Sequence, residues 1–281
     1  MNNNQPDKTE NIDGALVQHG NYNHRIYLMN IGTAHPDRLA SQLIALAKER
    51  GYSKIFAKVP SSKSSPFIEQ GFRVEARIPL FYSGQEEAQF LGYYLNDKRK
   101  LEPHNQRYNN ILKLAKIKQK EFKAKPLPRD YVIRPCVPSD IEAMAEIYRT
   151  VFPTYPFPIH DPAYLHDTMK THVMYFGIET KGQLVALSSA ETDQKSQNAE
   201  MTDFATLDKW RGHNLAYHLL KEMEHCMISK NIPVTYTIAR AESAGMNITF
   251  ARLGYLFGGR LINNTNIAGH IESMNVWYKK I

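Results

Sequence analysis

The sequence is poor in cysteine and in long apolar runs. Only two cysteines, Cys136 and Cys226, occur among 281 residues. A chain of this length with so few cysteines is typical of a reducing compartment, so no disulfide framework is expected. No stretch of about 18 apolar residues is present, so neither a membrane-spanning helix nor a membrane partner is expected. No group of Cys and His residues has zinc-ligand spacing, and no metal is expected.

The N-terminus lacks the apolar core of a signal peptide, because MNNNQPDKTENIDG is polar throughout. We therefore expect residues 1–20 to form a disordered tail, and we expect the protein to be cytoplasmic.

Negative charge is in deficit, and the net charge is +7. Much of the excess lies in residues 97–125, where Ile111, Leu112, Leu114, Ala115 and Ile117 fit one face of a helix and the lysines fit a solvated face. A lysine-rich solvated surface and attraction of an anionic ligand both account for this charge. No nucleic-acid-binding motif accompanies it, so no nucleic-acid partner is expected.

The clearest seam in the chain is KAKPLPRD, residues 123–130, where two prolines follow the lysine-rich helix. It predicts a domain boundary near residue 128, between a domain over 21–125 and a domain over 129–281. Behind the seam, strand and helix patterns alternate, which indicates an α/β fold with a mixed sheet.

The two halves share a weak internal repeat. Each half contains a long helix, a strand, a short helix, a glycine–aromatic pair and another strand. The short helix carries Phe67 in the front copy and Phe250 in the rear copy, and the pairs are Gly71-Phe72 and Gly254-Tyr255. Two unrelated helix–strand units remain the alternative.

The stretch AEMTDFATLDKWRGHNLAYHLL, residues 199–220, changes from a strand pattern to a helix pattern across a small basic turn. A turn that leads from a strand into a helix directs several free backbone amides toward one point, where the helix dipole adds positive charge. Such a turn is suited to a pyrophosphate, although a capped turn without a ligand has a similar sequence.

The order of elements over 131–281 resembles the GCN5-related N-acetyltransferase (GNAT) superfamily. Its Arg/Gln-x-x-Gly-x-Gly/Ala loop corresponds here to residues 211–216, RGHNLA, with Asn214 in place of a glycine. Asparagine is the non-glycine residue that best tolerates a left-handed backbone, so the turn is expected to persist.

Longer strings resemble the β-lysine N6-acetyltransferase branch of the superfamily: YPFPIHDPAYL, NAEMTDFATL, TYTIARA, GMNITFARLGY and NNTNIAGHIESMNVWYK. The resemblance covers most of 131–281 and, more loosely, 24–95. It implies acetyl transfer from acetyl-CoA to the side-chain amine of β-lysine, whose product is a compatible solute in some organisms. It also implies that the front domain is a degenerate GNAT half.

The resemblance implies a set of cofactor residues. They are Phe204, Ala205 and Thr206 on the strand, Arg211, Gly212, His213, Asn214, Leu215 and Ala216 in the turn, and Asn247 and Phe250 on the later helix. Phe250 stands where many members have a tyrosine that protonates the leaving thiolate, so the general acid is unassigned. Tyr255 is a nearby phenol at a position that is usually part of the core.

An alkylammonium, with a pKa near ~10.4, must lose a proton before it attacks a thioester, so a base is required. Strand alternation places Glu200 and Asp203 on opposite faces unless a bulge intervenes. Glu200 is the favoured base, and Asp203 is the alternative, either as base or as a carboxylate that attracts the ammonium.

Acceptor recognition is expected from His160, Asp161, Arg240 and Asn264, with the proline-rich loop 153–161 as a wall for the methylene chain. Another small primary amine is the alternative substrate, and a non-catalytic acetyl-CoA-binding module is the alternative class. Three roles stay open for the front domain: structure, a lid over the acceptor site, or a contact in a homodimer.

Overall fold

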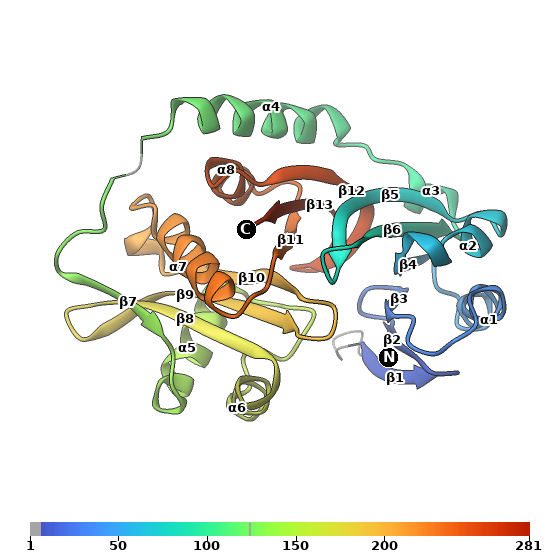
Figure 1. Cartoon of the computed structure of the whole chain (residues 1–281), viewed down its shortest axis with the longest axis horizontal. Coiled ribbons are helices and arrows are strands. Elements are labelled where there is room, and N and C mark those ends of the chain that lie inside the picture. Colours follow the sequence, from blue (N-terminus) through green and yellow to red (C-terminus); the bar gives the residue numbers. More distant parts are fainter. Residues whose placement is uncertain (1–6, 124) are drawn as a thin grey trace.

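The computed structural model describes residues 7–123 and 125–281, and its strands form one mixed sheet (Figure 1). The strand order is β1-β2-β3-β4-β6-β5-β12-β13-β11-β10-β9-β8-β7. The strands of the front half are β1 (Lys8–Ile12), β2 (Ala15–Gly20), β3 (Arg25–Asn30), β4 (Lys54–Pro60), β5 (Arg73–Tyr82) and β6 (Glu86–Tyr94). Those of the rear half are β7 (Tyr131–Pro135), β8 (Val173–Thr180), β9 (Gln183–Asp193), β10 (Asn198–Thr206), β11 (Val234–Arg240), β12 (Leu256–Ile267) and β13 (His270–Lys280).

The helices lie between these strands. The α-helices are α1 (Pro36–Glu49), α2 (Ser65–Glu69), α3 (Asp97–Lys100), α4 (Asn105–Glu121), α5 (Ile141–Val151), α6 (Pro162–Thr171), α7 (Leu215–Ser229) and α8 (Ala244–Arg252). Short 3₁₀ turns are η1 (Ser61–Lys63), η2 (Pro138–Asp140) and η3 (Asp208–Trp210). Among the described residues, no helix is both long and apolar enough to cross a membrane.

Helices cover both faces of the rear half (Figure 1). Helix α7 packs Leu219, Leu220 and Met223 against Met201 of β10 in one core cluster. Helices α5 and α6 pack against the other face, where Tyr148 and Leu165 meet Leu187 of β9. This two-sided packing explains the apolar runs VMYFGI in β8 and LVAL in β9.

The internal repeat predicted from the sequence is confirmed by the topology. In the front half the order is β1-β2-β3-β4-β6-β5, and in the rear half it is β8-β9-β10-β11-β13-β12. Each copy has one parallel pair, β3 with β4 and β10 with β11, and its other pairs are antiparallel. Phe67 packs edge-to-face on Phe72, as Phe250 does on Tyr255, so the glycine–aromatic pairs serve the same packing role.

The two copies join edge to edge through β5 and β12, whose register pairs Gly259 with Ala76. The joint also has a core of its own, in which Phe56 and Phe90 of the front half meet Tyr236 and Val276 of the rear half. The predicted domains therefore share one sheet and one apolar cluster.

The expectation of a disordered tail over 1–20 is wrong for residues 8–20, which form the hairpin of β1 and β2, and residues 1–6 lie outside the described part. The sequence of β1 is polar and has no strand pattern of its own, because this strand is stabilised by its pairing with β2.

Helix α4 also differs from expectation: Ala115 is buried, but Leu114 and Ile117 are exposed. It lies along α8, as Figure 1 shows.

Candidate active site

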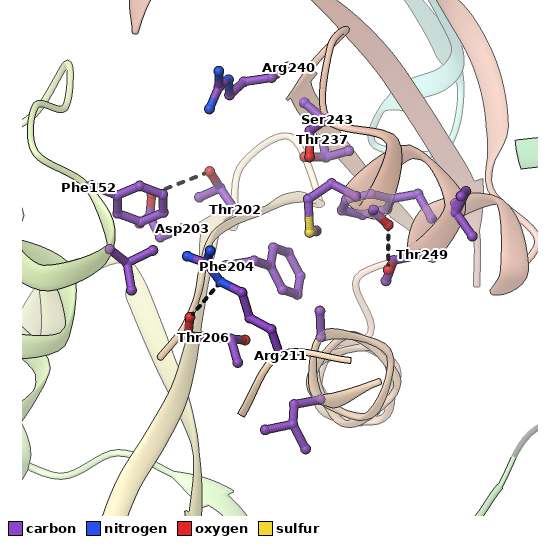
Figure 2. A pocket seen from close by; sticks show the side chains of 18 of the residues that line it. Phe152, Thr202, Asp203, Phe204, Thr206, Arg211, Thr237, Arg240, Ser243 and Thr249 are labelled. Atoms are coloured by element: carbon purple, nitrogen blue, oxygen red, sulfur yellow. Dashed lines mark hydrogen bonds between the residues drawn. The ribbon is translucent and has the colours of Figure 1, made fainter. Parts of the chain in front are cut away.

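Strands β10 and β11 diverge to form a groove. They pair in parallel only where Asn198, Ala199 and Glu200 face Val234, Thr235 and Tyr236, and they separate after that point. The space between them, here called the wedge groove, has a volume of about 660 Å³. Figure 2 shows Thr202, Phe204 and Thr206 of β10 on one side of the groove, with Thr237 and Thr249 on the other.

The turn before α7 closes one end of the wedge groove and presents free amides. Gly212 has a φ of 85° and Asn214 a φ of 58°, so the left-handed backbone predicted for the asparagine is confirmed. Among the described residues, no hydrogen-bond acceptor is found for the backbone amides of residues 212–216. Five consecutive free amides at a helix N-terminus form a site suited to an anion.

Most of the cofactor residues implied by the resemblance line the wedge groove: Phe204, Thr206, Arg211, Gly212, Asn214, Leu215, Ala216 and Phe250. Two others do not. Ala205 is buried in the core beneath α5 and α6, and the His213 ring interacts with the Trp210 carbonyl oxygen.

Asn247 has a structural role instead of the expected cofactor contact. Its side chain is fully buried, and its Nδ2 donates to the carbonyl oxygens of Arg240 and Ser243 at 3.0 and 2.8 Å. Its Oδ1 accepts from Asn275 Nδ2 and Trp277 Nε1, both at 2.8 Å. The amide therefore joins α8 to β11 and β13 and has no group left for a ligand.

A β-bulge brings both predicted carboxylates to one side of the sheet. Thr202 pairs with Ser189 of β9, but Ala205 pairs with Leu187, so β10 contains one extra residue. Asp203 has a φ of 52° at this point. A bulge reverses the alternation of side chains beyond it, and Asp203 therefore faces the same side as Glu200.

That side contains a second space, here called the inner cavity, of about 150 Å³. Glu191, Glu200 and Asp203 line it from the rear half, and Arg25 and Lys58 line it from the front half. The proline-rich loop between α5 and α6 contributes Tyr155, Pro156 and Phe157, and the remaining walls include Tyr27, Phe56, Tyr236, Asn264 and Met274. Tyr155, Thr202, Asp203 and Ile238 line both spaces, so the wedge groove and the inner cavity meet there.

Asp203 lies at this border and is 8% exposed. Three hydroxyl groups donate to its carboxylate: Ser189 Oγ at 2.6 Å, Thr202 Oγ1 at 3.4 Å, and Tyr155 Oη. Burial raises the pKa of Asp203, and these hydroxyl donors oppose the rise. The site therefore holds a desolvated carboxylate with fixed orientation, as a proton acceptor requires.

Glu200 and Glu191 face each other across β10 and β9. Burial raises the pKa of Glu200, while Lys58 and Tyr236 oppose the rise. Burial, together with the neighbouring Glu200 and Asp203, raises the pKa of Glu191 to about 8. Like charges on directly opposite strand positions repel, so this group of carboxylates favours a bound cation.

The acceptor residues expected from the sequence are mostly engaged elsewhere. Asp161 caps α6 by accepting from the amide of Ala163, and His160 lines neither space. Arg240 lines the wedge groove, but Glu272 already binds its guanidinium at two points, 2.7 and 2.8 Å. Asn264 does line the inner cavity, and its buried Oδ1 has no hydrogen-bond partner among the described residues.

Neither Phe250 nor Tyr255 supplies an acid. Phe250 lines the wedge groove without a titratable group, and the Tyr255 hydroxyl interacts with Thr235 Oγ1 at 2.8 Å within the core. This agrees with the interpretation of Tyr255 as a core residue.

Sequence reasoning missed Glu191, Tyr155, Lys58 and Arg25. Glu191 faces Glu200 in the hairpin, and hairpin register from a strand alternation could have identified it. Tyr155 lies in the proline-rich loop 153–161, but its contact with Asp203 depends on the bulge. Lys58 and Arg25 reach the site only because the two halves share a sheet, and the sequence gives no signal for that.

The chain is similar to several known acetyltransferases. Residues 141–255 match the model of the acetyltransferase (GNAT) family. The β-lysine N6-acetyltransferase of Methanococcus maripaludis is 37% identical over 273 residues, which cover 97% of this chain and 98% of that protein. The β-lysine N6-acetyltransferase of Methanosarcina mazei is 32% identical, covering 87% of this chain and 97% of that protein. The N-acetyltransferase YodP of Bacillus subtilis is 29% identical, covering 95% and 96%.

Proposed function

This chain belongs to the GNAT family of acetyltransferases, and from that premise we propose that it moves acetyl from acetyl-CoA to the side-chain (N6) amine of β-lysine. One observation carries the proposal. A groove ending in free backbone amides meets a small carboxylate-lined cavity at Asp203. An acyl donor with a pyrophosphate and an acceptor with ammonium groups need these two surfaces at one point.

The wedge groove fits the donor. The free amides of residues 212–216 bind the pyrophosphate, and the guanidinium of Arg252, whose Nη1 lies 3.2 Å from Asn214 Oδ1, adds positive charge beside them. Beyond Glu200, the edge of β10 that faces β11 has no strand partner and provides hydrogen-bonding groups for the amides of the pantetheine arm. Acetyl-CoA supplies an activated thioester at the far end of that arm.

The inner cavity fits the acceptor. Glu200 and Glu191 attract the ammonium groups. Asp203 lines both spaces and Glu200 only the inner cavity, so Asp203, in place of the Glu200 favoured from the sequence, accepts the proton that the reacting nitrogen must lose. The amine then attacks the thioester carbonyl, so that a C–N bond forms and the C–S bond breaks. The amide of Phe204, a residue without a register partner on β9 because of the bulge, is suited to stabilise the developing oxyanion.

The leaving thiolate takes its proton from solvent in this scheme. Phe250 has none to give, and Tyr155 donates to Asp203. Thiols have pKa values near ~8.5, so a thiolate is a competent leaving group without a dedicated acid.

β-Lysine is the favoured acceptor because two proteins named for that activity match nearly the whole chain, front half included. The product retains one ammonium and one carboxylate and has no net charge near neutral pH. A molecule of this kind suits a compatible solute, which is the role we propose for it.

The test is thiol release from acetyl-CoA with a panel of β-lysine, lysine, spermidine and an aminoglycoside. We expect turnover to be fastest with β-lysine, and mass spectrometry should locate the acetyl group on N6. Asp203→Asn should lower kcat by roughly 10²-fold or more, with Ser189→Ala as a control that keeps the charge. Faster turnover with spermidine would replace the acceptor assignment, and CoA binding without turnover of any amine would indicate a binding module.

A further inference from the structure

The front half contributes a buried cation to the inner cavity. We propose that Arg25 binds the carboxylate of the acceptor, so that the front half selects amino acids over simple polyamines. The inference rests on the proposed function, because it concerns the acceptor of the same reaction.

Among the described residues, no carboxylate forms an ion pair with Arg25; burial lowers its pKa to about 10, and Asp7 opposes this only from beyond ion-pair distance. It is 5% exposed and lines the inner cavity. Its Nη1 donates to the carbonyl oxygen of Asn264 at 2.6 Å and to Thr265 Oγ1 at 3.1 Å, and its buried Nε has no partner among the described residues. No carboxylate of the described chain lies within 4.0 Å of it. A buried charge without an opposite charge is costly, so a ligand carboxylate at this point gains the full benefit of compensation.

The other buried cations of the front half, Lys54 and Arg99, have their charged groups bound by other residues of the protein. Lys54 Nζ lies 2.8 Å from Glu75 Oε2 and donates to the carbonyl oxygen of Ile262. Arg99 donates to the carbonyl oxygens of Asn263 and Asn23 and to Ser53 Oγ. Neither residue lines the inner cavity. Arg25 is thus distinguished from Lys54 by the lack of an ion pair, and from both residues by its access to the inner cavity.

Lys58 also lines the inner cavity, but its charge serves the carboxylates of the rear half. Its Nζ lies 3.4 Å from the hydroxyl of Tyr236. Burial raises the pKa of both Glu191 and Glu200, and the positive charge of Lys58 opposes that rise. A ligand carboxylate is therefore better bound at Arg25, with which no carboxylate of the described residues forms an ion pair.

The distribution of charge across the inner cavity fits an amino acid whose reacting amine is distant from its carboxylate. Asp203 lies where the inner cavity meets the wedge groove. Arg25 lines only the inner cavity and not the wedge groove. An acceptor oriented with its amine toward the thioester therefore directs its other end toward Arg25. The guanidinium also offers two parallel donors, the geometry that a carboxylate binds best.

The experiment compares β-lysine with β-lysinamide, which has the same shape but no carboxylate. Wild type should prefer β-lysine by roughly 10²-fold in kcat/KM, the value expected for a charge-assisted hydrogen bond. Arg25→Met should abolish that preference by raising KM for β-lysine, while kcat/KM for the amide changes little. Arg25→Lys, which keeps the charge, should retain part of the preference.

Arg99→Met is the matched control, because Arg99 is equally buried and also anchors β12 but does not line the cavity. It should leave the preference intact. Equal losses for both substrates in Arg25→Met, or a wild type that does not distinguish them, would overturn the inference. Calorimetric binding of the two compounds gives the same comparison without turnover, so a failure of the proposed acetyl transfer would be recognised separately.

Discussion

Replacement of Asn214 tests the central feature of the donor site. The residue has a left-handed backbone, with φ 58° and ψ 28°, directly before α7. Asn214→Gly should bind CoA as wild type does, since glycine adopts this conformation freely. Asn214→Val should bind roughly 5- to 30-fold more weakly, because a β-branched residue pays about 1–2 kcal/mol in this region and the free loop relaxes out of it.

Asn214→Asp should have a larger effect. A carboxylate about 4 Å from a phosphate oxygen repels it by about 1 kcal/mol in water and about 4 kcal/mol at a protein surface. We therefore expect CoA affinity to fall by more than tenfold. Calorimetry with CoA measures each dissociation constant, and raised salt should reduce the loss because the turn is exposed.

S-Acetylpantetheine provides the decisive control, because it has the thioester but no pyrophosphate. All four proteins should use it with the same kcat/KM. If Asn214→Asp loses as much activity with this short donor as with acetyl-CoA, the turn affects the fold and not the pyrophosphate. Equal CoA affinity across the series would refute the reasoning as well.

Three further predictions concern stability and pH. Asn247→Ala should lower the free energy of unfolding by about 3 kcal/mol while KM for acetyl-CoA stays nearly constant, and urea unfolding against kinetics separates this from a cofactor contact. In wild type, kcat/KM for the acceptor should rise with pH as Glu191 loses its proton near its pKa of about 8, because the carboxylate attracts the ammonium group. A pH profile of Glu191→Gln should lack that rise. Gly259→Ala should destabilise strongly, because its Cβ would lie 2.2 Å from the carbonyl oxygen of Glu75; Gly245→Ala, with open space, is the control in the same unfolding assay.

The rear half was predictable from the sequence, because its helices and strands are specified by residues that are close together along the chain. The alternation of strands and helices expected behind residue 128 is observed, with α5, α6, α7 and α8 placed among the strands β7 to β13. The turn at Asn214 was also predictable, since its conformation depends on the residue's own steric preferences. These features rest on short-range physics, which a single sequence contains.

The catalytic surroundings were harder to predict, because they depend on long-range pairing. Whether Glu200 and Asp203 share a face depends on the bulge, and a bulge depends on the register with β9. Arg25 lies more than 160 residues before the carboxylates that line the same cavity. The expected acceptor residues Asp161 and Arg240 were plausible by type, but Asp161 binds the nearby amide of Ala163, and Arg240 pairs with Glu272 on another strand.

The mirrored strand order has a consequence for how such a site is built. Two identical chains that paired through the same edge strand would show this order and would form a symmetric dimer. In such a dimer every substitution appears twice, so a change that improves contact with one substrate alters the other subunit's chemistry too. Linking both copies in one polypeptide removes that constraint. The rear copy keeps the turn proposed to bind the pyrophosphate. The front copy is free to diverge and to bind the other end of the acceptor.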